Sequence, residues 1–362
     1  MHRRTAPDQR MLARMRTQET ALRTEQARLP PVFDRPTAIS AGYTRHQVTQ
    51  RARSGRWIAL RRGVFCLRET YDTASPGRRN ELQAAAARLA NRALNLVDSH
   101  ITAASRLALP LPLGEFPRAT LTDGCIAHSP RVDRNAVVQV ASLWPGDVID
   151  RSEGPLTSAA RTAADCLRHY SAEISVPLAD AAARSGQTSL SAIAEVLGRQ
   201  ATWPYAARAA AGLPLVDGRR ESWLESVSAV RLWGQGVDLA EPQVEVFDEL
   251  GTFVARVDAL WYPGLVVGEA DGITKYSLAD WAEPANAGAE ALRELRMDAV
   301  RRVVRREKER EDRLRETGLE VVRWSTAEIM GDPARVARRV QQALARAKPE
   351  RFRGTLRPTP AR

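Results

Sequence analysis

The sequence predicts a multidomain protein of the mixed α/β class, and three observations support this. Its 362 residues exceed the usual size of one domain, so two to three domains are expected. The composition is 44% hydrophobic and 27% charged, which excludes global disorder and collagen-like or coiled-coil repeats. Stretches with helical spacing of apolar residues are interspersed with short alternating runs, which indicates helices mixed with strands.

The charge balance points to an anionic partner. The chain has 54 Lys and Arg against 43 Asp and Glu, so its net charge is +11. A sequence pI near 10.3 favours nucleic acid as the first candidate partner. Arg-rich and Lys-poor usage also follows from GC-rich coding, with Lys275, Lys308 and Lys348 as the lysines. The positions of the arginines are therefore more informative than their number.

The cysteine and hydropathy patterns predict a cytoplasmic protein without a membrane partner. Cys66, Cys125 and Cys166 lie far apart, and neither they nor the histidines show the spacing of a zinc site. Sparse cysteines in an odd number fit a reducing compartment. The basic N-terminus lacks the apolar core of a signal peptide. No stretch reaches the length of apolar residues that a transmembrane helix needs.

Composition and turn residues divide the chain into successive segments. A stretch rich in Gly and Pro at residues 212–220 predicts a linker. The predicted segments are a charged arm (1–31), a small DNA-binding unit (32–75), a mixed α/β middle region (76–217), an αβ domain (218–330), and a basic helix with a tail (331–362). Helices are expected at residues 79–94, 158–170 and 189–200. The basic tail is expected to be loose and to add nonspecific affinity for nucleic acid.

The small N-terminal unit has a strong local excess of positive charge, because residues 35–68 contain eight arginines and no acid. Thr44 is expected to cap a helix, Ser54 and Gly55 to turn the chain, and two short strands to follow. This order of helix, turn and two-stranded ribbon predicts a winged helix. The residues predicted to contact DNA phosphates are Arg45, Arg51, Arg53, Arg56, Arg61 and Arg62. The alternative is a solvated basic surface that binds nothing.

Two parts of this region resemble a known family. Residues 42–47 (GYTRHQ) and 54–65 (SGRWIALRRGVF) resemble the N-terminal winged-helix domain of the abortive-infection type E antitoxins of type IV toxin–antitoxin systems. Residues 98–104 (DSHITAA) and 156–165 (LTSAARTAAD) are similar to the middle region of such proteins. The resemblance implies DNA binding, autoregulation at the protein's own promoter, and a toxin as a partner.

A group of carboxylates marks the C-terminal αβ domain. Residues 253–258 alternate as a strand, and residues 265–271 form a second strand after a turn at 262–264, which predicts a hairpin. With a period of two, Glu269 and Asp271 share a face, and hairpin pairing brings Asp258 near it. Glu225 is expected on a preceding helix, on the same side as Glu221. Clustered carboxylates favour a hard cation, so Asp258, Glu269 and Glu225 are the predicted ligands of Mg²⁺ or Mn²⁺.

The order of these elements resembles the PD-(D/E)XK nuclease core. Matches at 221–226 (ESWLES), 255–258 (ARVD), 269–272 (EADG) and 318–324 (GLEVVRW) resemble the very-short-patch-repair endonuclease-like family. The resemblance implies metal-dependent hydrolysis of DNA phosphodiesters, with the metal held by Asp258 and Glu269 and supported by Glu225. Asp271 and Lys275 would position water or phosphate, although Asp271 stands where the superfamily commonly has Lys. The alternative is a non-catalytic, antitoxin-like regulator with an inactive nuclease fold.

Overall fold

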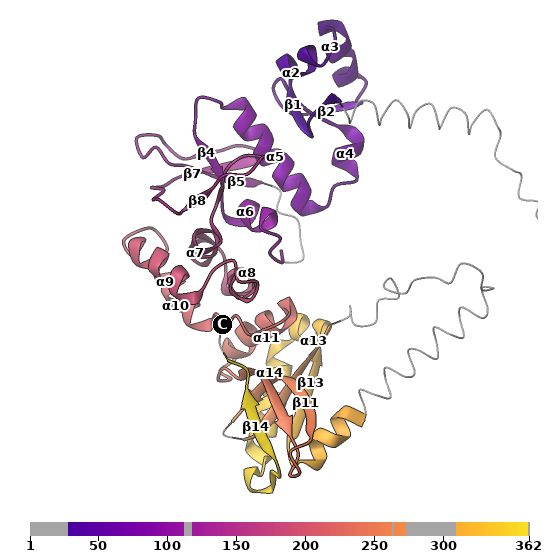
Figure 1. Cartoon of the computed structure of the whole chain (residues 1–362), viewed down its shortest axis with the longest axis vertical. Coiled ribbons are helices and arrows are strands. Elements are labelled where there is room, and N and C mark those ends of the chain that lie inside the picture. Colours follow the sequence, from indigo (N-terminus) through magenta and orange to yellow (C-terminus); the bar gives the residue numbers. More distant parts are fainter. Residues whose placement is uncertain (1–27, 112–117, 263, 273–308, 361–362) are drawn as a thin grey trace, which may run out of the picture. The chain divides into compact units, whose positions relative to one another are not determined.

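A computed structural model describes residues 28–111, 118–262, 264–272 and 309–360 (Figure 1). The predicted mixed α/β class is confirmed. The chain forms two compact units, residues 1–162 and 163–362. The sequence places a boundary at 217/218 instead, but residues 163–217 belong to the C-terminal unit. The expected linker is fixed there, because Arg220 forms a 3.0 Å ion pair with the fully buried Asp180.

The first unit begins with a three-stranded antiparallel sheet in the order β1-β3-β2. Its elements are β1 (Val32–Asp34), α2 (Arg35–Ser40), α3 (Arg45–Arg53), β2 (Trp57–Arg61), β3 (Val64–Leu67) and α4 (Arg68–Asp72). The predicted cap is confirmed, since the Thr44 hydroxyl accepts a hydrogen bond from Gln47 N and the Gln47 side chain accepts one from Thr44 N. The buried rings of Phe33, Trp57 and Phe65 pack together beneath the helices.

A six-stranded sheet in the order β6-β7-β5-β4-β9-β8 completes this unit. Its elements are β4 (Leu96–Asp98), α6 (His100–Arg106), β5 (Ala119–Asp123), β6 (Arg131–Val132), β7 (Ala136–Val140), β8 (Val148–Ile149) and β9 (Leu156–Thr157). Helix α5 (Pro76–Ala90) packs against both sheets of this unit. Leu82 and Ala86 pack with Leu60 of the small sheet, whereas Ala84 packs with Leu121 of the large one. The small sheet is therefore joined to the large one through a shared core.

The second unit opens with helices. They are α7 (Ala159–His169, which begins in the first unit), α8 (Ala172–Arg184), α9 (Leu190–Arg199), α10 (Ala206–Gly212), the short η1 (Leu213–Leu215) and α11 (Trp223–Trp233). The predicted helices at 79–94, 158–170 and 189–200 correspond to α5, α7 and α9. Helix α8 contains Pro177 and packs against α11. These helices form the helical layer of the unit, and within it α11 contacts β12 of the C-terminal sheet.

The C-terminal sheet has five strands in the order β13-β12-β11-β10-β14. They are β10 (Glu241–Phe247), β11 (Phe253–Trp261), β12 (Val266–Asp271), β13 (Glu320–Ser325) and β14 (Thr355–Pro358). Strands β10 to β12 are antiparallel neighbours, and β13 joins β12 in parallel. Residues 309–316 are helical, and α13 (Thr326–Gly331), α14 (Pro333–Arg346) and η4 (Pro349–Arg351) follow β13. The expected loose tail is corrected, because β14 pairs with β10 over four residues.

Candidate functional site

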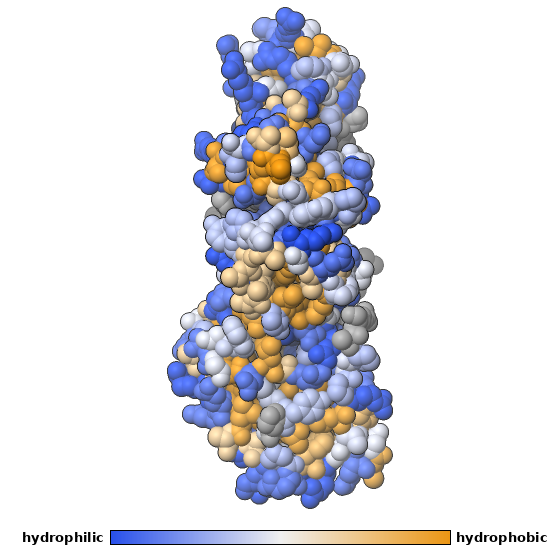
Figure 2. Space-filling model, turned by 90° about the vertical axis from the view of Figure 1, so that its left-hand side faces the viewer, coloured by the Kyte–Doolittle hydropathy of each residue, from blue (hydrophilic) through white to orange (hydrophobic). Residues whose placement is uncertain are grey.

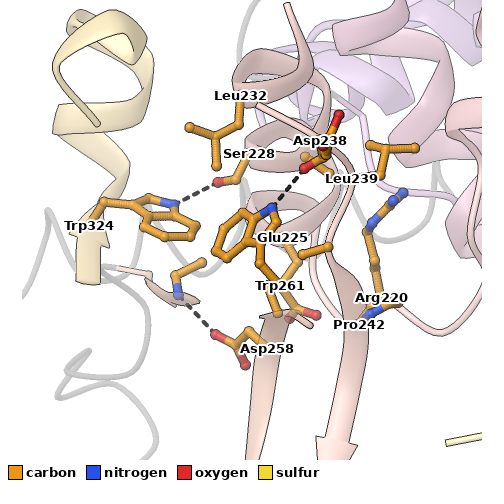
Figure 3. Close-up of a pocket in the computed structure, with 14 residues that line it drawn as sticks. Arg220, Glu225, Ser228, Leu232, Asp238, Leu239, Pro242, Asp258, Trp261 and Trp324 are labelled. Atoms are coloured by element: carbon orange, nitrogen blue, oxygen red, sulfur yellow. Dashed lines mark hydrogen bonds between the residues drawn. The ribbon is translucent and has the colours of Figure 1, made fainter. Parts of the chain in front are cut away.

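A small cavity lies between α11 and the C-terminal sheet, and two predicted site residues line it (Figure 3). Asp258 comes from β11 and Glu225 from the first turn of α11. The cavity has a volume of about 30 Å³, which is room for about one water molecule. The indole nitrogens of two lining tryptophans are satisfied, Trp261 by the Asp238 carbonyl and Trp324 by the Ser228 hydroxyl. The walls of the cavity are therefore fixed by hydrogen bonds.

Asp258 lies where the ladder between β11 and β12 ends. Paired residues run from Trp261 and Val266 to Ala259 and Gly268. One residue further on, Oδ2 of Asp258 accepts a 2.9 Å hydrogen bond from Ala270 N. The carboxylate thus contacts the backbone of the residue that follows Glu269. The predicted hairpin is confirmed, and it brings Asp258 next to the Glu269–Asp271 segment.

Glu269 is buried, with 1% of its side chain exposed, and it forms an ion pair. Arg310 NH2 lies 2.8 Å from Oε1 of Glu269 and also 2.8 Å from the Arg256 carbonyl oxygen. Asp271 is on the same strand two residues later, and its carboxylate lies 3.9 Å from Arg323 NH1. Both acids of β12 are therefore next to arginines from the segment that follows.

Glu225 has a structural task of its own. It is the third residue of α11, and its Oε2 accepts hydrogen bonds from Glu221 N at 2.9 Å and from Gln243 Nε2 at 2.8 Å. The expected helical pairing of Glu221 with Glu225 is corrected, because the helix begins at Trp223 after the cap Ser222. Gln243 is buried and has a positive φ of 55°, so β10 is irregular beside Asp258.

The predicted set of three metal ligands does not meet in one place. Within the ranges that the structure describes, no group of three or more His, Cys, Asp or Glu side chains is arranged to hold a metal ion. Lys275 lies outside the described residues. Mg²⁺ nevertheless needs only one or two carboxylates, because it retains several waters. Asp258 and Glu269 provide oxygen donors of that kind, and a metal at Glu269 would have to displace Arg310.

A buried ion pair supports the cavity from the helical layer. Arg220 lines the cavity, is 4% exposed, and donates to Oδ2 of Asp180 and to the Leu215 carbonyl. Burial raises the pKa of Asp180 to about 6, and the Arg220 guanidinium opposes that rise. Asp217 N also donates to Oδ1 of Asp180 at 2.7 Å. Sequence reasoning missed this residue, since Arg220 stands in a stretch that looked like a linker.

Of the six N-terminal arginines predicted to contact DNA, four are exposed, and Arg51 and Arg61 contact other side chains of the protein. Arg45, Arg53, Arg56 and Arg62 are exposed on α3, the following turn and the hairpin tip. Arg51 lies over the Tyr43 ring, with its guanidinium carbon 4.8 Å from the ring centroid. These five side chains border the same helix and hairpin, as the sequence predicts.

Arg61 is engaged within the protein, which revises the expected phosphate contact from this residue. Its NH1 and NH2 lie 2.7 and 3.2 Å from the two carboxylate oxygens of Asp133, and 16% of its side chain is exposed. Burial raises the pKa of Asp133, but the hydrogen bonds and charge of Arg61, together with hydrogen bonds from the backbone N–H groups of Asn135 and Ala136, outweigh this and hold it below its usual value. Asn135 also donates to the Leu60 carbonyl. The hairpin tip is thus tied to the loop before β7.

Comparison of the chain with protein-family models and with curated proteins finds no match. Both family resemblances therefore remain predictions from the sequence. Among the described helices, none has the combination of length and apolar character needed to cross a membrane.

Proposed function

We propose that this protein binds DNA through its N-terminal winged helix and cleaves DNA phosphodiesters in its C-terminal αβ core with the help of Mg²⁺ or Mn²⁺. One observation carries the proposal for cleavage. Asp258 at the open end of the β11–β12 hairpin accepts a hydrogen bond from Ala270 N, so its carboxylate lies beside the part of β12 that carries Glu269 and Asp271. The helix before the hairpin and the parallel strand after it agree with a PD-(D/E)XK core.

The metal would be held by Asp258 and Glu269. When bound, it would polarise the phosphate and lower the pKa of a coordinated water. Asp271 would orient water or phosphate beside them, and Glu225 would support Asp258 from the opposite wall of the cavity. Lys275 is proposed to act beside these carboxylates on the basis of the sequence alone.

DNA binding is supported by the acid-free stretch at residues 35–68 and by the exposed arginines on α3 and the hairpin. Thr44 and Gln47 fix the start of α3, so the helix presents Arg45 and Arg53 from a defined position. Such contacts position a protein on DNA without reading its sequence.

A second function is favoured by the state of Glu269. Arg310 lies 2.8 Å from Oε1 of Glu269, and because removing one partner of a buried ion pair destabilises a fold, this carboxylate has a structural role that needs no catalysis. We propose as the alternative a non-catalytic regulator that represses its own promoter and pairs with a toxin.

The deciding experiment incubates the full chain with supercoiled plasmid and Mg²⁺ or Mn²⁺, beside a sample with chelator. The variants are Asp258→Asn and Glu269→Gln. The matched control is Glu245→Gln, because Glu245 is a half-exposed carboxylate on β10 of the same sheet. Nicked or linear plasmid should form only with metal, should be lost in both site variants, and should persist in the control.

The cleavage proposal fails if the wild-type chain does not cut with metal, or if both site variants cut as fast as the wild type. Retained binding of duplex DNA without cutting would support the regulator.

A further inference from the structure

An exposed tyrosine in the helical layer is held in an unfavourable backbone conformation. Tyr205 precedes α10 with φ 65° and ψ 15°, and 57% of its surface is exposed. This left-handed region is uncommon for residues other than glycine, and such strain is concentrated at functional sites. The chain thus keeps a large ring in solvent at an energetic cost, which argues for a use outside the core.

The ring lies beside a cation, Arg208, and beside the imidazole of His169, whose pKa is lowered by burial. The Arg208 guanidinium carbon lies 5.2 Å from the centroid of the Tyr205 ring, and the His169 ring meets it edge-on at 5.6 Å. Arg208 NH1 donates to the carbonyl oxygens of Arg168 and His169, which fixes its position at the end of α7. The chain contains no acid between Glu195 and Asp217. The aromatic ring therefore lies in a positive environment that its own segment does not neutralise.

An open hollow begins at the residues that follow Tyr205. It is lined by residues of α7, α9 and α10 and has a volume of about 500 Å³, within the usual range for small-ligand sites. Ala206 and Ala207, which follow Tyr205 directly, form part of the wall. Arg168 forms another part, held by Asp165 and Gln200. Figure 2 shows the side of the molecule on which α9 and α10 lie in Figure 1, with apolar residues among hydrophilic ones.

We propose that Tyr205 is a stacking platform for an unpaired base of a single-stranded nucleic acid. Every base presents a π-face, so an exposed aromatic ring beside a cation binds single strands with little sequence preference. Arg208 supplies positive charge next to the ring, and the alanine-lined pocket receives the flanking sugar or base. This site shares no residue with the proposed duplex contacts or with the pair of carboxylates. The inference therefore adds a binding site to the proposed function.

The test measures the affinity of the full chain for a labelled oligothymidine strand and for a duplex of equal length, by fluorescence anisotropy. Tyr205→Gly should raise the single-strand Kd about tenfold, while Tyr205→Phe keeps the ring and the affinity. Glycine adopts a positive φ freely, so the thermal midpoint of Tyr205→Gly should not fall. Tyr262→Ala is the matched control, since Tyr262 is also an exposed tyrosine but lies beside Glu241.

The proposal is overturned if Tyr205→Gly binds the single strand as well as the wild type, or if Tyr262→Ala loses as much affinity. It is also overturned if the wild-type chain does not bind the single strand, in which case a protein or small aromatic ligand would fit the pocket better. The plasmid assay has a separate outcome. If the wild-type chain does not cut plasmid, the nuclease proposal fails but the single-strand inference does not. If the single-strand inference fails in the anisotropy assay, the nuclease proposal is unaffected.

Discussion

The salt dependence of duplex binding should come mainly from the arginines that the fold leaves available. Of the six predicted DNA contacts, two are engaged inside the protein, Arg61 with Asp133 and Arg51 over Tyr43. The other four are exposed, and the described part of the chain gives their side chains no ion pair: Arg45, Arg53, Arg56 and Arg62. We expect these four to account for the counterions released on binding.

The magnitude follows from counterion release. Each phosphate contact contributes about −0.9 to the slope of log K against log salt concentration. Four contacts from this unit give a slope of about −3.6, whereas all six would give about −5.4. Replacing Arg62 by Gln should reduce the slope by about 0.9 and weaken binding about eightfold at ~0.1 M salt. Replacing Arg61 by Gln should change the slope little, because Asp133 already neutralises it.

The assay is a titration of a labelled duplex at several salt concentrations for the wild type and the two single variants. Arg62→Gln and Arg61→Gln differ by one position on the same hairpin, so each is the other's control. The reasoning is refuted if Arg61→Gln reduces the slope as much as Arg62→Gln does, since the ion pair with Asp133 would then open on binding.

Three further outcomes concern stability and reactivity. Arg310→Ala should lower the free energy of unfolding by about 2–3 kcal/mol, because it leaves the buried Glu269 without its partner; denaturant titration measures this, and an additional Glu269→Gln change should restore part of the loss. Gly318→Ala should cost at least about 2 kcal/mol in the same measurement, since φ is 95° and the new Cβ would lie 2.5 Å from the Arg351 carbonyl oxygen; an unchanged midpoint would contradict the strain. Cys125 is exposed, so iodoacetamide should label it in the native protein while the two buried cysteines react only after unfolding, and mass spectrometry of native peptides would reveal any other order.

Local patterns in the sequence predicted local structure well. Thr44 and Gln47 have the side chains of a capping box, and the box forms because both partners lie within one turn. Alternation at residues 253–258 predicted β11, and the short apolar run at 265–271 after a turn predicted β12, which is buried on both faces. The hairpin pairing predicted for these strands brings Asp258 next to the Glu269–Asp271 segment.

Contacts between residues that are distant in the chain could not be predicted from the sequence. Nothing in the segment around Arg310 indicates that its side chain reaches Glu269, 41 residues earlier. The sequence also gave no sign that Arg61 would pair with Asp133, since each lies among residues that look solvated. Strand β14 was hidden by its basic, proline-containing composition, which is typical of an edge strand as well as of a tail.

The tie between Arg61 and Asp133 has a mechanical consequence. Together with the hydrogen bond from Asn135 to the Leu60 carbonyl and the shared α5 core, this ion pair restricts rotation of the small basic unit relative to the six-stranded sheet. A duplex held by α3 and the hairpin would therefore be presented at one fixed attitude to that sheet. A rotation of the bound DNA would then turn the six-stranded sheet together with the small basic unit.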